Sequence, residues 1–155
     1  MILAASGGHL EMLQILLASG MIDDNDRGQA VVKSMENGRL EIAKTLLVSS
    51  SISKINRTSA VIFAASGGHL EILEILLASG MIDDKDKGQA LIKAAENDHL
   101  EIVKSLLAQG GIDEDDRKTA FDEARKRKLP GSRQIMQVLL ADWLHQGNLY
   151  ECDVS

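Results

Sequence analysis

Histidine is a common metal ligand, and three of the four histidines in this sequence stand in one local context. His9, His69 and His99 each precede a Leu-Glu pair, and they are separated by thirty or sixty residues. A zinc site needs three or four ligands that converge on one ion. Because these histidines belong to successive units of a repeating pattern, we expect them to lie apart and to have a structural role.

Acidic segments are the second feature that could bind a metal. Residues 23–28 (Asp-Asp-Asn-Asp-Arg-Gly) partly match a calcium-binding loop. However, Arg27 stands where an oxygen ligand is needed, and Ser34 stands where the bidentate glutamate should be. We therefore predict solvated turns whose carboxylates lie near helix N-termini. The acidic run 113–116 could attract a basic partner, but such runs are usually solvated surface.

No catalytic arrangement is evident from the remaining residues. The pairs Gly7-Gly8 and Gly67-Gly68 lack the Lys-Ser/Thr that a phosphate-binding loop requires, so we interpret them as turns between helices. No Ser-His-Asp or Cys-His arrangement is suggested by position. The sequence predicts that the protein is not an enzyme and that it uses no cofactor and no metal.

Composition narrows the class of partner. The chain has 155 residues and a formal net charge of −6, whereas a nucleic-acid surface needs a concentrated basic face. The one basic run, 125–128, is short and suits the end of a helix. Cys152 is the only cysteine, which rules out an intramolecular disulfide. We find no signal peptide and no apolar run that could span a bilayer, so we expect a cytoplasmic protein that binds neither nucleic acid nor membrane.

A repeat of thirty residues organises the chain. The same Leu-Glu start and the same Leu-Leu pair recur four times, with second helices expected to begin at Leu10, Leu40, Leu70 and Leu100. An alanine column recurs with the same spacing at Ala30, Ala60, Ala90 and Ala120. In addition, residues 2–24 and 62–84 are identical except at three positions: Leu3/Phe63, Met12/Ile72 and Gln14/Glu74. This near-identity indicates duplication of a block of two repeats.

Each unit has the pattern of two helices. In 100–107 the apolar residues recur at helical spacing, which predicts a helix with one buried face. The segment 89–96 predicts a preceding helix, and 83–88 predicts a polar connector. Turn residues at 37–38, 67–68 and 97–98 separate the two helices. These features predict an all-α solenoid of stacked helix-turn-helix repeats with a C-terminal capping helix.

The residues 65–80 (Ala-Ser-Gly-Gly-His-Leu-Glu-Ile-Leu-Glu-Ile-Leu-Leu-Ala-Ser-Gly) resemble the second half of an ankyrin repeat. Residues 89–95 stand where that family usually has Thr-Pro-Leu-His-x-Ala-Ala, a motif absent from every unit. The resemblance extends to about Ala141. It implies a protein–protein interaction module in which the repeated histidine braces the helix start. Because each unit is shorter than the usual ~33 residues, we expect the projecting β-hairpins to be shortened or lost.

The two ends differ from the middle. We predict one domain over residues 1–146, with about five units of which the first is incomplete, and a flexible tail over 147–155. A last helix near 135–140 is expected to cap the row, with Ser132 at its start and Trp143 and Tyr150 closing the end. Met1–Ala5 enters partway through a helix. We expect either a missing first segment or an end that seats against a partner or another copy, in a protein that is otherwise a monomer.

Two columns of the repeat vary while their neighbours stay small or apolar. They are Leu3, Lys33, Phe63, Lys93 and Glu123, and Ser6, Glu36, Ser66, Glu96 and Lys126. The resemblance implies that the first column lines a concave groove. We predict partner binding by seven of these residues: Lys33, Glu36, Phe63, Ser66, Lys93, Glu96 and Glu123. Phe63 is either a local packing substitution or an aromatic anchor between two lysines.

The resulting hypothesis is a scaffold that binds a segment of a partner protein on its concave helical face. The alternative is a targeting or substrate-recruiting fragment of a larger multidomain protein or enzyme, including a host-directed effector. A third hypothesis is a purely structural role as a homo-oligomer.

Overall fold

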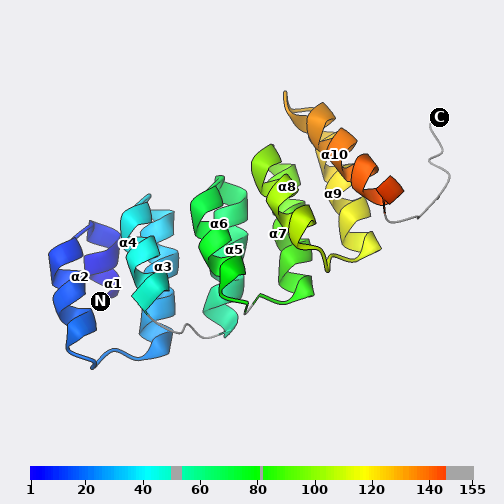
Figure 1. Ribbon diagram of the computed structural model, residues 1–155. Coiled ribbons are helices and arrows are strands. Elements are labelled where there is room, and N and C mark those ends of the chain that lie inside the picture. The colour runs from blue at the N-terminus through cyan, green and yellow to red at the C-terminus, as the bar shows by residue number, and fades with distance from the viewer. Residues whose placement is uncertain (50–53, 81, 146–155) are drawn as a thin grey trace.

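The computed structural model describes residues 1–49, 54–80 and 82–145, and within them it contains ten helices and no strand (Figure 1). The helices are α1 (Ile2–Gly7), α2 (Leu10–Ala18), α3 (Asp24–Glu36), α4 (Leu40–Ser49), α5 (Lys54–Gly67), α6 (Leu70–Ala78), α7 (Asp84–Glu96), α8 (Leu100–Gln109), α9 (Glu114–Arg127) and α10 (Ser132–His145). None of these described helices is both long enough and apolar enough to cross a membrane. The all-α prediction is confirmed.

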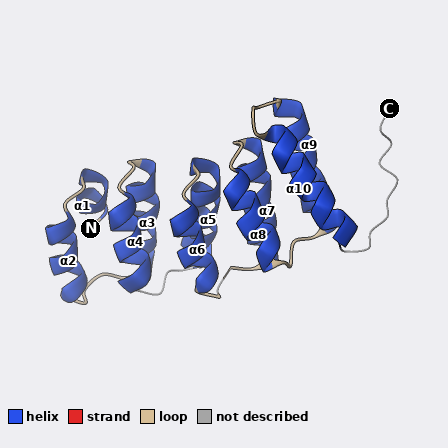
Figure 2. Ribbon diagram, turned by 45° about the horizontal axis from the view of Figure 1, so that its top comes forward, coloured by secondary structure: helices blue, strands red, loops and turns tan. Residues whose placement is uncertain are grey.

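Consecutive helices form five antiparallel pairs that stand side by side in a row, from α1–α2 to α9–α10 (Figure 1). Figure 2 shows that tight turns join the helices of each pair along one edge, whereas the connectors from α2 to α3 and from α8 to α9 run along the other. The odd-numbered helices pack closely against one another, and the even-numbered helices contact each other less. The odd-numbered helices therefore lie on the inner side of the row, as in a curved solenoid.

The even-numbered helices α2, α4, α6 and α8 begin at the four leucines that the repeat predicts. A left-handed residue precedes each start, and Gly68 has φ 76°. This conformation lets the amide of His69 donate to the carbonyl oxygen of Ala64 at 2.9 Å, which closes the end of α5. In the fourth unit Asp98 takes the same conformation, with φ 66°. The predicted turns between helices are confirmed.

The predicted start of the odd-numbered helices at Gln89 is wrong, because α7 begins five residues earlier, at Asp84. Asp83 is the N-cap, and its side chain accepts a hydrogen bond from the amide of Asp86 at 2.9 Å. Asp23 and Asp113 cap α3 and α9 in the same way. The acidic residues that follow lie in first turns, where the helix dipole favours negative charge. The segment that partly matches a calcium loop is thus a cap and a helix start.

Small residues let neighbouring units approach closely. The alanines of the repeated column, Ala30, Ala60, Ala90 and Ala120, are fully buried. On α4, α6 and α8 the first leucine of the Leu-Leu pair enters the core, and Leu46 and Leu106 are 0% exposed. Because each unit contributes the same positions, one apolar core runs along the whole row.

The last pair closes the row at its C-terminal end. Helix α10 extends over Ser132–His145, well beyond the predicted 135–140. The rings of Phe121 and Trp143 lie 6.0 Å apart, between centroids, across α9 and α10. The prediction that Ser132 is the N-cap of this helix is wrong, because α10 begins at Ser132 itself. The hydroxyl of Ser132 accepts a hydrogen bond from the amide of Leu129 at 3.0 Å. Tyr150, Cys152 and the predicted tail lie outside the described residues.

Candidate functional site

The two variable columns lie on the odd-numbered helices. Helix α3 carries Lys33 and Glu36, α5 carries Phe63 and Ser66, α7 carries Lys93 and Glu96, and α9 carries Glu123. Side chains three positions apart share one face of a helix, and stacking of the units aligns those faces. We call these seven residues the inner stripe: Lys33, Glu36, Phe63, Ser66, Lys93, Glu96 and Glu123.

Phe63 is the large apolar side chain of the inner stripe, and 37% of it is exposed. The next two residues, Ala64 and Ala65, are fully buried against neighbouring units. Phe63 therefore points away from the packed side of α5. Its counterpart in the first unit, Leu3, is 85% exposed. An exposed aromatic side chain between charged neighbours has the composition of a contact residue at an interface.

Each lysine of the inner stripe is paired within its own helix. The Nζ atom of Lys33 lies 2.7 Å from Oε2 of Glu36, and Lys93 and Glu96 are equally close. The cationic flanks expected beside Phe63 are thus balanced by carboxylates. Both lysine side chains remain about half exposed, at 51% and 47%. An exposed pair of this kind contributes about 0–1 kcal/mol, so a carboxylate from a partner can compete for the lysine.

The charge order reverses in the fifth unit, where Lys126 pairs with Glu123 at 2.7 Å. Arg127 of α9 reaches back to Glu96 of α7 and forms an ion pair between units. The hydrogen bond from Lys93, with the charge of Arg127 beside it, lowers the pKa of the Glu96 carboxyl. The basic run 125–128 therefore supplies ion pairs to the end of a helix.

One of the repeated histidines, His99, joins two helix pairs. The Nε2 atom of His99 lies 3.0 Å from the carbonyl oxygen of Ser66 in the preceding unit. The ring also lies over Gly68, where a Cβ atom would come within 2.8 Å of it. Burial, together with the charge of His99, lowers the pKa of His69. Within the described residues no group of three His, Cys, Asp or Glu side chains could hold a metal ion.

A second repeat position also contacts the preceding unit, and the sequence did not predict these contacts. The side chain of Asn56 is buried, and its Nδ2 atom donates to the carbonyl oxygen of Asn25 at 3.3 Å. It lies directly over Gly28 of the preceding unit, while Asp116 lies over Gly88 in the same way. Burial raises the pKa of Asp116, and the nearby carboxylates add to the effect. The recurrence of glycine at positions 28 and 88 is the feature of the sequence that could have indicated this close approach between units.

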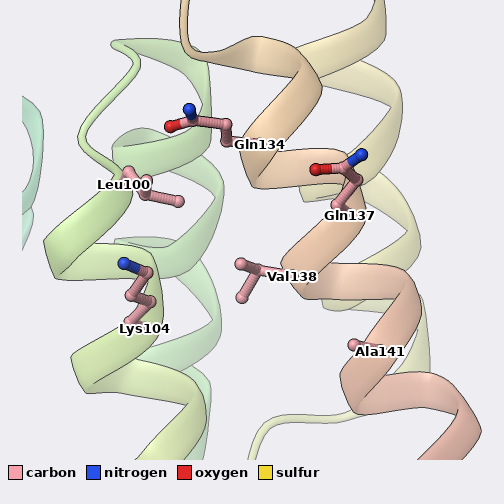
Figure 3. Close-up of a pocket in the computed structure, with 6 residues that line it drawn as sticks. All are labelled: Leu100, Lys104, Gln134, Gln137, Val138 and Ala141. Carbon is pink, nitrogen blue, oxygen red and sulfur yellow. The ribbon is translucent and has the colours of Figure 1, made fainter.

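An open groove of about 420 Å³ lies between α8 and α10, on the even-numbered side of the row (Figure 3). Its lining residues are Leu100, Lys104, Gln134, Gln137, Val138 and Ala141. Val138 projects toward α8, and the two glutamine side chains lie above it in the view of Figure 3. Lys104 already pairs with Glu101 at 2.8 Å. The groove lies on other helices than the inner stripe.

The fold and the aligned helix faces define a helical repeat solenoid. Residues 49–118 match the family model described as ankyrin repeats (3 copies). The helix pairs on either side of this segment repeat its arrangement, so the row as a whole resembles a set of ankyrin repeats. Ankyrin repeats are generally protein–protein interaction modules and are typically non-enzymatic. No curated protein sequence matches this chain.

Proposed function

We propose that the inner stripe binds a segment of another protein and that Phe63 is its anchor. The observation that carries this proposal is an aromatic side chain, 37% exposed, in a column that is lysine in both units beside it. Odd-numbered helices on the inner side of the row offer a continuous surface along which an extended segment can lie. Variation between units at these positions, with small or apolar residues around them in the first four units, supports a surface that differs along its length.

The proposed partner segment has an apolar side chain with acidic residues next to it. The apolar side chain covers Phe63. Carboxylates of the partner segment replace Glu36 and Glu96 as the ion-pair partners of Lys33 and Lys93. This replacement costs little free energy because both pairs are exposed. Charge complementarity of this kind sets specificity and association rate more than affinity.

The test is selection of binding peptides from a random displayed library, followed by calorimetry on the selected peptides. We expect the peptides to share an apolar residue next to Asp or Glu. Phe63→Ala should weaken binding about 30-fold, which corresponds to ~2 kcal/mol for an aromatic anchor. Phe63→Leu, which introduces the side chain found at Leu3, should retain most of the affinity.

Val48 provides the matched control, because it is 76% exposed on the even-numbered helix α4. Val48→Ala should leave the affinity unchanged. Circular dichroism verifies that each variant remains helical. Unchanged affinity in a folded Phe63→Ala variant would refute the proposed anchor.

A further inference from the structure

The N-terminal face of the row exposes apolar side chains. Met12 of α2 is 55% exposed, although Ile42, Ile72 and Ile102 at the same position of the next three units are 1–4% exposed. Those three units each have a helix pair on their N-terminal side, whereas α1 and α2 have none in the structure. The position of Met12 therefore faces the preceding unit.

The internal near-repeat shows what covers such a face. Residues 2–24 and 62–84 differ at three positions only, so the first and third units carry almost the same surface. In the third unit that surface is covered by α3 and α4, which pack against α5 and α6. There Leu76 and Ile82 are buried, while their counterparts Leu16 and Ile22 in the first unit are only half-buried. Nearly the same sequence thus occurs twice: residues 62–84 have a helix pair on their N-terminal side, and residues 2–24 have none in the structure.

Polar groups on the N-terminal face of α1 and α2 also fit a preceding helix pair. Lys44 of α4 forms an ion pair with Glu71 of α6, and Glu11, the counterpart of Glu71, is exposed on α2. His99 bonds to a carbonyl oxygen at the end of the preceding odd-numbered helix, and the side chain of its counterpart His9 is also exposed. The face therefore offers a carboxylate and an imidazole at positions that other units use to hold a preceding helix pair.

We propose that the N-terminal face of α1 and α2 docks one further helix pair of this repeat type, with the surface that α3 and α4 present to α5 and α6. Its lysine at the position of Lys44 pairs with Glu11, and its apolar side covers Met12. The C-terminal end of a second copy does not have this surface. At the position that Met35, Ala65 and Ala95 occupy in the middle units, that end has Arg125, which is charged and exposed.

The test uses the chain's own residues as the occupant. Residues 24–61 are placed directly before Ile2, so that the junction from Val61 to Ile2 reproduces the natural junction from Val61 to Ile62. We expect the midpoint of thermal unfolding to rise by about 5 °C or more, in a single transition. Amide hydrogen exchange in α2 should slow by about tenfold or more.

The control is Met12→Glu. In the unextended chain this change should have little effect, because Met12 is mostly exposed. In the extended chain it should abolish both gains. A separate unfolding transition for the added pair, or unchanged exchange in α2, would overturn the proposal. A dimer of the unextended chain in light scattering, dissociated by Met12→Glu, would also overturn the proposal. That result would assign the N-terminal face to a second copy of the chain.

Discussion

The imidazole of His99 is hydrogen-bonded to the backbone carbonyl oxygen of Ser66, with 3.0 Å between Nε2 and the oxygen. The two residues lie in different helix pairs, so this bond fastens the fourth unit to the third. Its loss leaves a partly buried carbonyl group without this donor. We expect His99→Ala to lower the free energy of unfolding by about 1–2 kcal/mol.

His9 is the matched control for this prediction, because it occupies the same repeat position and is exposed at the open end. His9→Ala should change the free energy of unfolding by less than about 0.5 kcal/mol. Urea denaturation of both variants measures the difference. Equal losses in the two variants would show that the bond between units does not stabilise the row.

The lowered pKa of His69 predicts a dependence of stability on pH. Burial disfavours its protonated form in the folded chain, whereas the unfolded chain takes up the proton near the ordinary value of 6.5. Below that value the unfolded state binds more protons than the folded state, so the free energy of unfolding falls as the pH decreases. The fall continues until the lowered pKa of the folded state is passed.

Urea denaturation between about pH 7.5 and pH 5.5 tests this expectation, in a range above the usual titration of carboxylates. In His69→Gln the fall in stability should be smaller than in the wild type. If both proteins lose stability equally over this range, another group is responsible.

Gly28 has a steric role that its helical position does not suggest. A Cβ atom there would lie 2.2 Å from Nδ2 and 2.3 Å from Cβ of Asn56, a buried residue of the next unit. Gly28→Ala should therefore destabilise the protein by about 1–3 kcal/mol, despite the gain of up to about 1 kcal/mol that alanine gives in a helix. Gln29→Ala, at the exposed neighbouring position of α3, should be neutral or stabilising. A Gly28→Ala variant more stable than the wild type would show that the units can separate at this point.

Periodicity was sufficient to predict the architecture. The starts of the even-numbered helices follow from the recurrent Leu-Glu pair, and the turns follow from Gly68 and its counterparts, because both depend on local sequence. The odd-numbered helices were placed too late, since an aspartate-rich segment is compatible with either a loop or an acidic first helical turn. The capping hydrogen bond of Asp83 decides between them.

Contacts between units were harder to predict than helices. Asn56 and Asn25 are thirty-one residues apart, and nothing local indicates that one amide bonds to the other. By contrast, the pairing of Lys33 with Glu36 follows from their spacing of three residues on a helix. The sequence alone therefore predicted that the seven residues of the inner stripe lie on aligned helix faces, but it did not predict that both lysines are paired with carboxylates.

Recognition of a partner by the inner stripe is the proposal on which the function of this protein rests. NMR titration of the isotope-labelled chain with a selected peptide tests it most directly, because every backbone amide reports its own surroundings. We expect shifts to concentrate on α3, α5 and α7, with the largest changes around Phe63, and Phe63→Ala to need about 30-fold more peptide for the same shifts. Shifts concentrated on α4, α6 and α8, or in the groove between α8 and α10, would contradict the proposal.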